Sequence, residues 1–345
     1  MRRTTLYILA ICATCATGGG CTGLQASMDP AGSPGRQIAS LWWLYCGVGI
    51  GVYLITMFFI LLAVRRKRRI EGPSDAPVVD TQPEPRRERR LTVVVSASLG
   101  LTTIILLVLM FAEFATTRAV ASLSGDQQPL KVRIIARQWW WEVRYEERPT
   151  SEIVITANEI HIPVGRTIQF DLESPDVIHS FWVPKLAGKK DIIPGHGASL
   201  YLKADEPGTY FGQCAEFCGY QHAKMRFVVV AETQENFEKW RASQLAPAKS
   251  PATETQQRGQ EVFLGSTCVM CHTISGTSAR GTVGPNLSHV ASRDKIAAGS
   301  LPNRPGHLAG WIMDPQKIKP GVRMPQHNLA PTDLRALLEY LQSLK

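Results

Sequence analysis

The chain has 345 residues, of which 44% are hydrophobic and 19% charged, with a formal charge of +9. The length allows two or three domains. The basic surplus does not indicate nucleic acid binding, because residues 65–90 hold nine basic and five acidic side chains whereas residues 118–246 hold fifteen and sixteen. The eight cysteines do not fit a disulfide framework: three lie in or beside the amino-terminal leader, one lies in an apolar run, and four form two metal-type pairs.

Residues 1–21 have the pattern of a signal peptide. Arg2 and Arg3 precede an apolar run, and small residues follow it. Cys21 comes directly after three glycines, so it is either a lipidated amino terminus or a residue near a plain cleavage site. The leucine usually found three residues before a lipidated cysteine is missing.

Two long apolar stretches follow, residues 38–64 and 91–117, and Glu113 is their one charged residue. Since about 20 apolar residues cross a bilayer core, both are long enough to span a membrane. Basic clusters lie after the first stretch and before the second, and such clusters stay in the cytoplasm. We therefore predict a two-span hairpin over residues 22–117 with a cytoplasmic basic loop. Everything after it lies outside, and Trp42, Trp43 and Tyr45 fit an interfacial aromatic belt.

The region 118–241 is predicted to be an all-β domain. Many short alternating runs with Pro and Gly turns between them favour a sandwich or Greek-key barrel. The expected strands are residues 131–135, 142–145, 159–162, 167–172, 199–203, 208–212 and 226–230.

Trp139, Trp140 and Trp141 are consecutive, and neighbouring residues of a strand point to opposite faces. The three side chains therefore cannot all lie in the core. We expect one or two of them to pack inside and one to rest on membrane headgroups.

The segment from Gly212 to Met225 places two thiols, an imidazole and a thioether within twelve residues, Cys214, Cys218, His222 and Met225. Sulfur with imidazole suits copper, zinc or iron–sulfur, and the thioether favours copper. With His179 upstream and a free backbone carbonyl, the donors exceed the needs of one tetrahedral ion and fit two coppers bridged by the two sulfurs. A Cys2His2 zinc site with Met225 as core is the alternative. A disulfide would leave the histidines unexplained.

Residues 242–254 are rich in Ala, Pro, Ser and Thr and predict a flexible linker. A small all-α domain is expected over residues 255–345. A helix is predicted over Gly259–Cys268, leading into the C-x-x-C-H heme attachment motif of Cys268, Cys271 and His272. Residues 331–344 predict an amphipathic helix. A zinc site is not favoured here, because there is no second cysteine pair.

The run from Asp176 to Trp240 resembles the binuclear copper (CuA), cupredoxin-like domain of cytochrome c oxidase subunit II. The matching blocks are residues 176–184, 191–195, 212–225 and 237–240. The resemblance implies that the coppers are held by His179, Cys214, Cys218, His222, Met225 and the carbonyl of Glu216. It also implies that the Glu216 side chain reaches a magnesium site shared with subunit I, and that electrons enter at Trp139. Quinol-oxidising relatives lack these ligands, so their presence favours a cytochrome c pathway.

Two further positions are interpreted through the same resemblance. Glu88 matches a carboxylate near a proton uptake site of subunit I, although Leu91 and Val95 replace the usual Trp and Pro. A solvated glutamate among arginines is the alternative. Asp191 lies in a block that faces subunit I or the docking surface, and its role stays open.

Residues 255–345 resemble a class I cytochrome c, with Gly284–Leu287 at the family's distance from the attachment motif. The loop 319–325 is similar to the family's methionine loop, which implies that Met324 is the second axial ligand opposite His272; a thioether there raises the iron potential. Met313, His307 and His327 are the competitors. We interpret His161 as a strand histidine, His196 as a loop histidine and His289 as structural or surface.

Together these resemblances imply subunit II of a heme–copper cytochrome c oxidase in the respiratory chain. It would pass electrons from covalent heme c to two coppers and on to subunit I, where oxygen reduction to water is coupled to proton translocation. Subunit I, subunit III, membrane lipid and a cytochrome or quinol-dehydrogenase-linked donor are the expected partners, at the inner membrane. The alternatives are a subunit of a CuA-containing nitric oxide reductase and a membrane-anchored copper protein without redox role.

Overall fold

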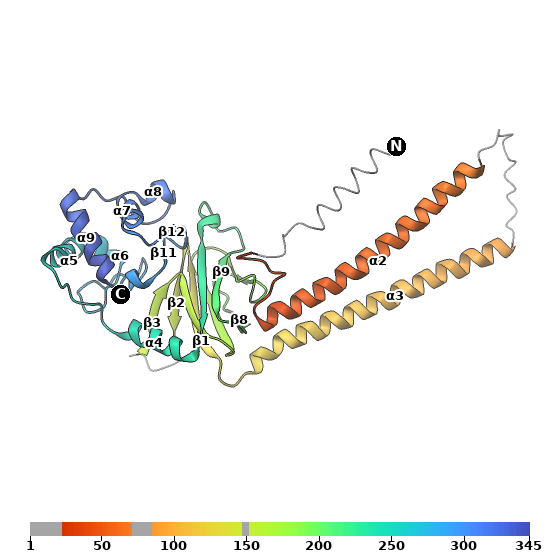
Figure 1. Cartoon of the computed structure of the whole chain (residues 1–345), viewed down its shortest axis with the longest axis horizontal. Helices are drawn as coiled ribbons and strands as arrows, with labels where there is room; N and C mark the ends of the chain where they lie inside the picture. Colours follow the sequence, from red (N-terminus) through yellow and green to blue (C-terminus); the bar gives the residue numbers. More distant parts are fainter. Residues whose placement is uncertain (1–22, 71–84, 147–151) are drawn as a thin grey trace. The chain divides into compact units, whose positions relative to one another are not determined.

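A computed structural model describes residues 23–70, 85–146 and 152–345. The expected signal peptide, Cys21 and most of the loop between the spans lie outside the described residues. The chain divides into two compact units, one of residues 37–122 and one of residues 1–36 with 123–345. Figure 1 shows the order of the elements along the chain.

The first unit is a pair of long helices, α2 (Ser33–Ile70) and α3 (Pro85–Ala121). Both are long and apolar enough to cross a membrane. None of the residues in the most apolar stretch of either helix is buried inside the protein. The hydroxyl of Tyr45 donates a hydrogen bond to Glu113 Oε2 at 3.4 Å, so the lone charge of the second span has a partner on the first. The two expected spans are confirmed as apolar helices.

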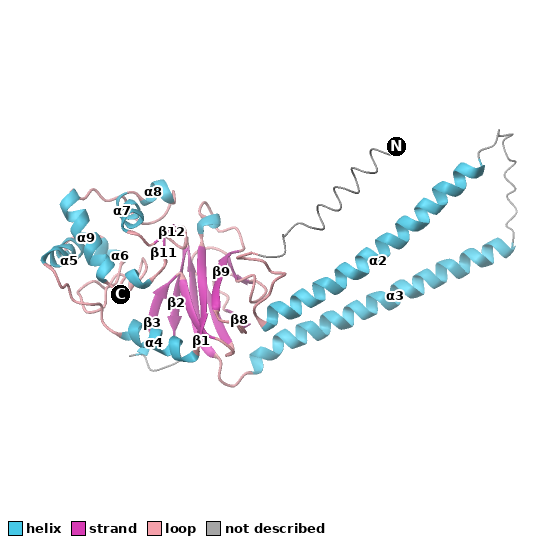
Figure 2. Cartoon of the chain, in the orientation of Figure 1, coloured by secondary structure: helices cyan, strands magenta, loops and turns pink. Residues whose placement is uncertain are grey.

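The second unit contains two five-stranded sheets, drawn as magenta arrows in Figure 2. The first has the order β3 (Val154–Ala157), β2 (Trp140–Tyr145), β1 (Leu130–Arg137), β5 (Ile168–Glu173), β8 (Ala198–Leu202). The second has the order β4 (Glu159–Pro163), β10 (Arg226–Glu232), β9 (Gly208–Cys214), β6 (His179–Trp182), β7 (Lys190–Ile192). The pairs β1–β5 and β4–β10 are parallel and the rest antiparallel.

All seven expected strands are present with small shifts of their ends. The prediction missed β3, β6 and β7. The two strands β6 and β7 are short, and the first three residues of β6 are all buried, so that strand has no alternation to detect. The burial of apolar side chains between the sheets confirms the expected β sandwich.

Two of the three consecutive tryptophans pack inside, as expected. Trp139 and Trp141 are buried, and the ring of Trp141 packs edge-on against Phe181 and Phe227. Trp140 is half-buried, with the Arg137 guanidinium 5.9 Å from the centre of its ring.

Helix α4 (Gln234–Leu245) closes the β domain. Thr233 caps it by accepting a hydrogen bond from Asn236 N, and Phe237 is fully buried. Because α4 runs to Leu245, the first residues of the predicted linker are helical. The irregular segment is residues 246–253.

The carboxyl-terminal domain contains α5 (Glu254–Leu264), α6 (Cys268–Cys271), α7 (Pro305–Met313), α8 (Pro315–Ile318) and α9 (Pro331–Ser343). The helix predicted over 259–268 is corrected: it begins five residues earlier, capped by Thr253, and ends at Leu264. A β-carbon on Gly259 would lie 2.0 Å from Ala336 O, so glycine permits the close crossing of α5 and α9. One two-stranded ribbon, β11 (Lys295–Ile296) with β12 (Leu301–Pro302), accompanies the expected helices.

Candidate functional site

Most of the expected metal ligands lie on one loop between two neighbouring strands. We call residues 214–225 the ligand loop. It begins at Cys214, the last residue of β9, and ends at Met225, just before β10. A hydrogen bond from Cys214 N to Met225 O (3.0 Å) closes it, and another from Ala215 N to Ser180 O (3.0 Å) ties it to β6. Since β6 begins at His179, the sheet register brings this distant histidine to the loop.

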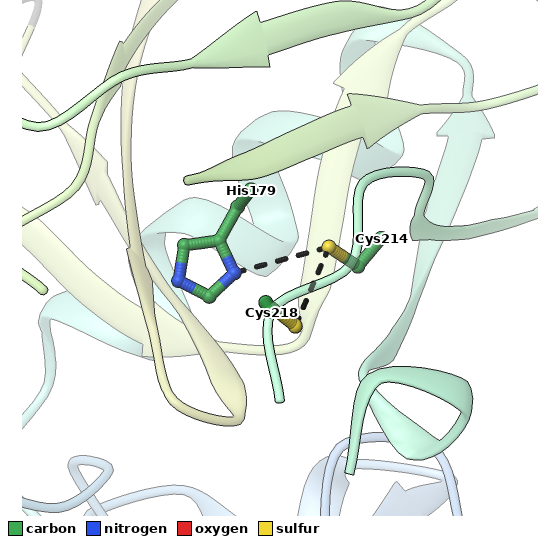
Figure 3. Close-up of side chains that lie close together, drawn as sticks. All are labelled: His179, Cys214 and Cys218. Atoms are coloured by element: carbon green, nitrogen blue, oxygen red, sulfur yellow. Dashed lines mark hydrogen bonds between the residues drawn. The ribbon is translucent and has the colours of Figure 1, made fainter. Parts of the chain in front are cut away.

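The six expected donors form one continuous chain of contacts. Cys214 Sγ lies 3.8 Å from His179 Nδ1 and 3.8 Å from Cys218 Sγ, as the dashed lines in Figure 3 show. The Glu216 carbonyl oxygen is 3.2 Å from Cys214 Sγ. On the other side, Cys218 Sγ lies 3.7 Å from His222 Nδ1 and 3.8 Å from Met225 Sδ. The donors therefore fall into two groups, each around one sulfur.

One of the two expected histidine ligands lies outside the tightest group of donors. Among the described residues, His179, Cys214 and Cys218 each bring one ligand atom within 4.8 Å of the other two, and His222 falls outside that group. Four ligands about 2.0–2.3 Å from one zinc would all lie within roughly 4 Å of one another. The 3.8 Å between the two sulfurs also excludes a disulfide, whose bond is about 2.05 Å long.

Asp176 fixes the orientation of the His179 imidazole. Its Oδ1 accepts a hydrogen bond from His179 Nε2 at 2.9 Å, which leaves Nδ1 directed at Cys214. The same carboxylate accepts bonds from Val177 N and Gln138 N, both at 2.7 Å. Burial raises the pKa of Asp176, but these hydrogen bonds outweigh it and lower the pKa to about 2. A carboxylate behind a ligating histidine is the usual support of a metal site.

The two thiols lie in contact and shift each other's pKa in opposite directions. Contact with Cys218 lowers the pKa of Cys214 to about 3, with His179 acting in the same direction against burial. The pKa of Cys218 is raised, first by Cys214 and then by burial. Metal binding requires both sulfurs as thiolates, and the lowered pKa of Cys214 favours that form at this position.

Two aromatic rings pack against glycines at the site, Phe227 against Gly212 and Trp139 against Gly219. A β-carbon on Gly212 would lie 2.2 Å from the Phe227 ring, so only glycine lets that ring pack under the strand. Trp139 Nε1 donates a hydrogen bond to the Cys218 carbonyl at 2.9 Å. A β-carbon on Gly219 would be 3.0 Å from the Trp139 ring, so this indole lies directly on the ligand loop.

A second site lies in the carboxyl-terminal domain around Cys268, Cys271 and His272. The two cysteines are the ends of the single turn α6, and both thiols are free. His272 Nδ1 is 2.7 Å from the Pro285 carbonyl oxygen, so Nδ1 carries the proton. The unprotonated Nε2 is then the nitrogen available to bind a metal. Burial lowers the pKa of His272, which favours the neutral, ligating form. A β-carbon on Gly284 would lie 2.6 Å from His272 Cε1, so the backbone holds this ring tightly.

Among the candidates for the opposite axial ligand, Met324 packs against the apolar core of this domain. Gln316 Nε2 donates to the carbonyls of Val322 (2.9 Å) and Met324 (3.0 Å), which braces the loop. His307 is exposed, while Met313 and His327 are half-buried. The free thiols, the imidazole and the apolar core beside Cys268 and Met324 fit a covalent heme.

The remaining residues considered from the sequence make none of the contacts that define the two sites. His161 is in β4, between Glu232 (2.7 Å) and Glu159 (3.2 Å) and stacked on Trp240. His196 and Asp191 are exposed, and His289 is buried with Nε2 on the Ala246 carbonyl. Glu88 is exposed in the first turn of α3.

The sequence reasoning missed two functional candidates. Asp176 was recognised as part of a matching block but received no role; an aspartate three residues before a ligand histidine was the available signal. Lys319 is the first residue of the methionine loop and received no role of its own, because nothing in the sequence showed that its side chain would be buried, with 2% exposure.

Comparisons with known proteins agree with this division of the chain. The family model of the cytochrome c oxidase subunit II periplasmic domain matches residues 146–232, and the cytochrome c model matches residues 256–345. Cytochrome c oxidase subunit 2 of Alkalihalophilus pseudofirmus is 31% identical over 94% of this chain and 93% of its own length. Quinol oxidase subunit 2 of Bacillus cereus is 29% identical over 64% of this chain and 74% of its own.

Among solved structures, the periplasmic domain of cytochrome oxidase subunit II from Bradyrhizobium japonicum is 27% identical. It covers 34% of this chain and 94% of its own, with a TM-score of 0.32.

Proposed function

The chain belongs to the cytochrome c oxidase subunit II family, and we propose that it passes electrons from its own heme c to a pair of coppers and on to subunit I. It is a membrane-anchored subunit with an outer β domain and a fused cytochrome c domain. The reduction of oxygen to water and the coupled movement of protons would occur in subunit I.

One observation carries the proposal: six donors form an unbroken chain of contacts around two facing sulfurs. His179 and the Glu216 carbonyl lie by Cys214, whereas His222 and Met225 lie by Cys218. Two ions would use all six donors, whereas one zinc would leave two of them unused. Thiolate, imidazole and thioether together suit copper. When bound, the copper pair and the heme supply one-electron redox chemistry.

The protein's contribution is to hold the ligands still. Asp176 fixes the orientation of His179. The hydrogen bond from Cys214 N to Met225 O holds the two ends of the ligand loop together. Ligands held by strands and by hydrogen bonds keep their geometry when the charge of the site changes.

In the heme domain, Cys268 and Cys271 would form the thioether bonds, and His272 Nε2 and Met324 would be the axial ligands. Trp139 would be the point where electrons pass to the ligand loop. Its indole donates to the Cys218 carbonyl, and a β-carbon on Gly321 of the heme domain would lie 3.6 Å from its ring. Because Trp139 is only 8% exposed, a separate donor would reach the heme and not this indole.

Metal analysis with electron paramagnetic resonance tests the copper assignment on the full-length chain. We expect two coppers per heme iron and one unpaired electron shared by both coppers. His222→Ala should abolish the shared signal, and His196→Ala, which alters an exposed loop histidine, should retain it. One zinc per chain, or no colour after reconstitution with copper, would refute the proposal.

The remaining assignments follow from the family and the same site. The partners would be subunit I, subunit III and a cytochrome or quinol-dehydrogenase-linked donor, at the inner membrane. The half-buried Glu216 side chain would reach a magnesium ion at the subunit I interface. Residues 1–21 would be the signal peptide, 22–117 the hairpin, 118–241 the copper domain, 242–254 the linker and 255–345 the cytochrome domain.

The catalytic partner distinguishes the alternatives. Copurification with a catalytic subunit that reduces nitric oxide and not oxygen would convert the assignment to a nitric oxide reductase. Loss of copper to a competing chelator, without any heme-to-copper transfer, would indicate a copper-binding protein without redox role.

A further inference from the structure

Four consecutive residues of the heme domain contact the ligand loop and its neighbour Trp139. We call residues 318–321 the latch segment. Lys224 Nζ donates to the Ile318 carbonyl, and Gln221 Nε2 donates to the Pro320 carbonyl at 2.8 Å. Gly321 lies beside the rings of Trp139 and Tyr220. The segment therefore lies on the part of the ligand loop that contains His222 and Met225.

Lys319 is the residue of the latch segment whose side chain crosses between the domains. Its Nζ donates to the carbonyls of Trp139 (2.9 Å) and Lys224 (3.0 Å) in the copper domain and of Ala297 (3.3 Å) in its own domain. The side chain is 2% exposed and forms no ion pair within the described part of the chain. Burial of an amine without an acidic partner is costly, so apolar packing alone does not explain a lysine here.

A second contact supports the same docking. Ala297, Ala298 and Gly299, at the tip between β11 and β12, all have positive φ, of 52°, 54° and 74°. Two alanines in this region store strain, which persists only where surrounding contacts hold it. The Ala298 carbonyl accepts a bond from Arg226 N (3.2 Å) at the start of β10, while Ala297 supplies the third acceptor of Lys319.

The latch segment is also rigidly joined to the proposed axial ligand. Gln316 Oε1 accepts from Gly321 N at 2.8 Å, and its Nε2 donates to the Met324 carbonyl at 3.0 Å. A continuous route thus runs from Met324 through Lys319 to the Trp139 carbonyl, and from the Trp139 indole to the Cys218 carbonyl.

We propose that Lys319 is a positioning residue for electron transfer: its amine holds the latch segment on the ligand loop and so fixes the heme domain against Trp139. The inference rests on the proposed heme-to-copper transfer. Three N–H donors of one terminal group meet three carbonyls from three separate segments, an arrangement that no apolar side chain and no single amide can reproduce. An ordinary structural lysine of the heme domain would not place two of its three acceptors on the other domain.

The test uses Lys319→Met in the full-length chain with heme and copper bound, with Lys317→Met as control. Lys317 lies in α8, two residues before Lys319, with a side chain 85% exposed. Amide hydrogen exchange of residues 138–141 and 219–225 reports docking, and flash-induced electron injection reports the heme-to-copper rate. We expect Lys319→Met to raise exchange there at least tenfold and to slow transfer at least fivefold. The heme and copper spectra and potentials should stay unchanged, and Lys317→Met should match the unaltered chain.

Unchanged exchange in Lys319→Met would overturn the proposal, and so would raised exchange with an unchanged transfer rate. If Lys319→Met fails to fold, Lys319→Gln, which is neutral and one bond shorter, should give the same pair of changes. Failure of the underlying function is distinguishable, because the unaltered chain would then lack the shared copper signal whatever the state of the interface.

Discussion

Replacement of Asp176 by asparagine should weaken the copper site without touching a copper ligand. The carboxylate accepts from His179 Nε2 and Val177 N through Oδ1, and from Gln138 N through Oδ2. An amide has one oxygen, so it cannot serve both sides, and at least one buried N–H is left facing an NH2 group.

The size of the effect follows from those bonds. One unsatisfied buried N–H costs about 1–3 kcal/mol of stability. Loss of the carboxylate behind a ligating histidine lowers metal affinity by about 10–100-fold, which is roughly 1.4–2.7 kcal/mol of binding free energy. If the asparagine oxygen takes the place of Oδ1, Gln138 N loses its hydrogen-bond acceptor, and the turn that carries Trp139 is destabilised.

Copper affinity is measured by competition with a chelator, and geometry by electron paramagnetic resonance. Asp191→Asn is the matched control, because Asp191 is exposed and should leave affinity unchanged. An Asp176→Asn chain with the affinity and spectrum of the unaltered chain would show that the His179 orientation is set elsewhere.

The same carboxylate predicts a pH dependence in the metal-free domain. The folded pKa of Asp176 is about 2, below its ordinary 3.8. A lowered acid pKa stabilises the fold above about pH 4, and the contribution is lost as the pH falls through 2. The difference in unfolding free energy between the unaltered chain and Asp176→Asn should therefore shrink between pH 4 and 2, by at most about 2 kcal/mol. A difference constant over this range would contradict the assignment.

Four further changes test the rest of the route. Trp139→Phe should slow heme-to-copper transfer while the copper spectrum stays intact, because it removes the bond to the Cys218 carbonyl, at a cost of about 0.5–1.5 kcal/mol in denaturant unfolding; an unchanged rate removes Trp139 from the route. Met324→Ala should abolish the His/Met charge-transfer band and lower the heme potential, and survival of the band would reassign the ligand. Gly284→Ala should reduce heme incorporation, since the new β-carbon would lie 2.6 Å from the His272 ring; full incorporation in heme-stained gels would contradict the tight packing. Glu88→Gln should slow oxygen consumption modestly, and unchanged turnover in an assembled complex would leave it a solvated glutamate.

The sequence by itself determined the features that depend on neighbours along the chain. The two apolar spans, seven strands and the carboxyl-terminal helix follow from local periodicity. The donors of the ligand loop and the C-x-x-C-H motif lie within a few residues of one another, so their spacing alone indicates a chemistry. The short strands β3, β6 and β7 were missed, and β6 has no alternation to detect because its first three residues are all buried.

The tertiary structure decided what distant segments contribute to each site. His179 reaches the ligand loop because β6 pairs with β9, and the division of the donors around two sulfurs exists only in three dimensions. The carboxylate of Asp176 and the amine of Lys319 act through hydrogen bonds to segments far along the chain. No spacing encodes such partners, because they depend on which strands pair and on which domain packs against them.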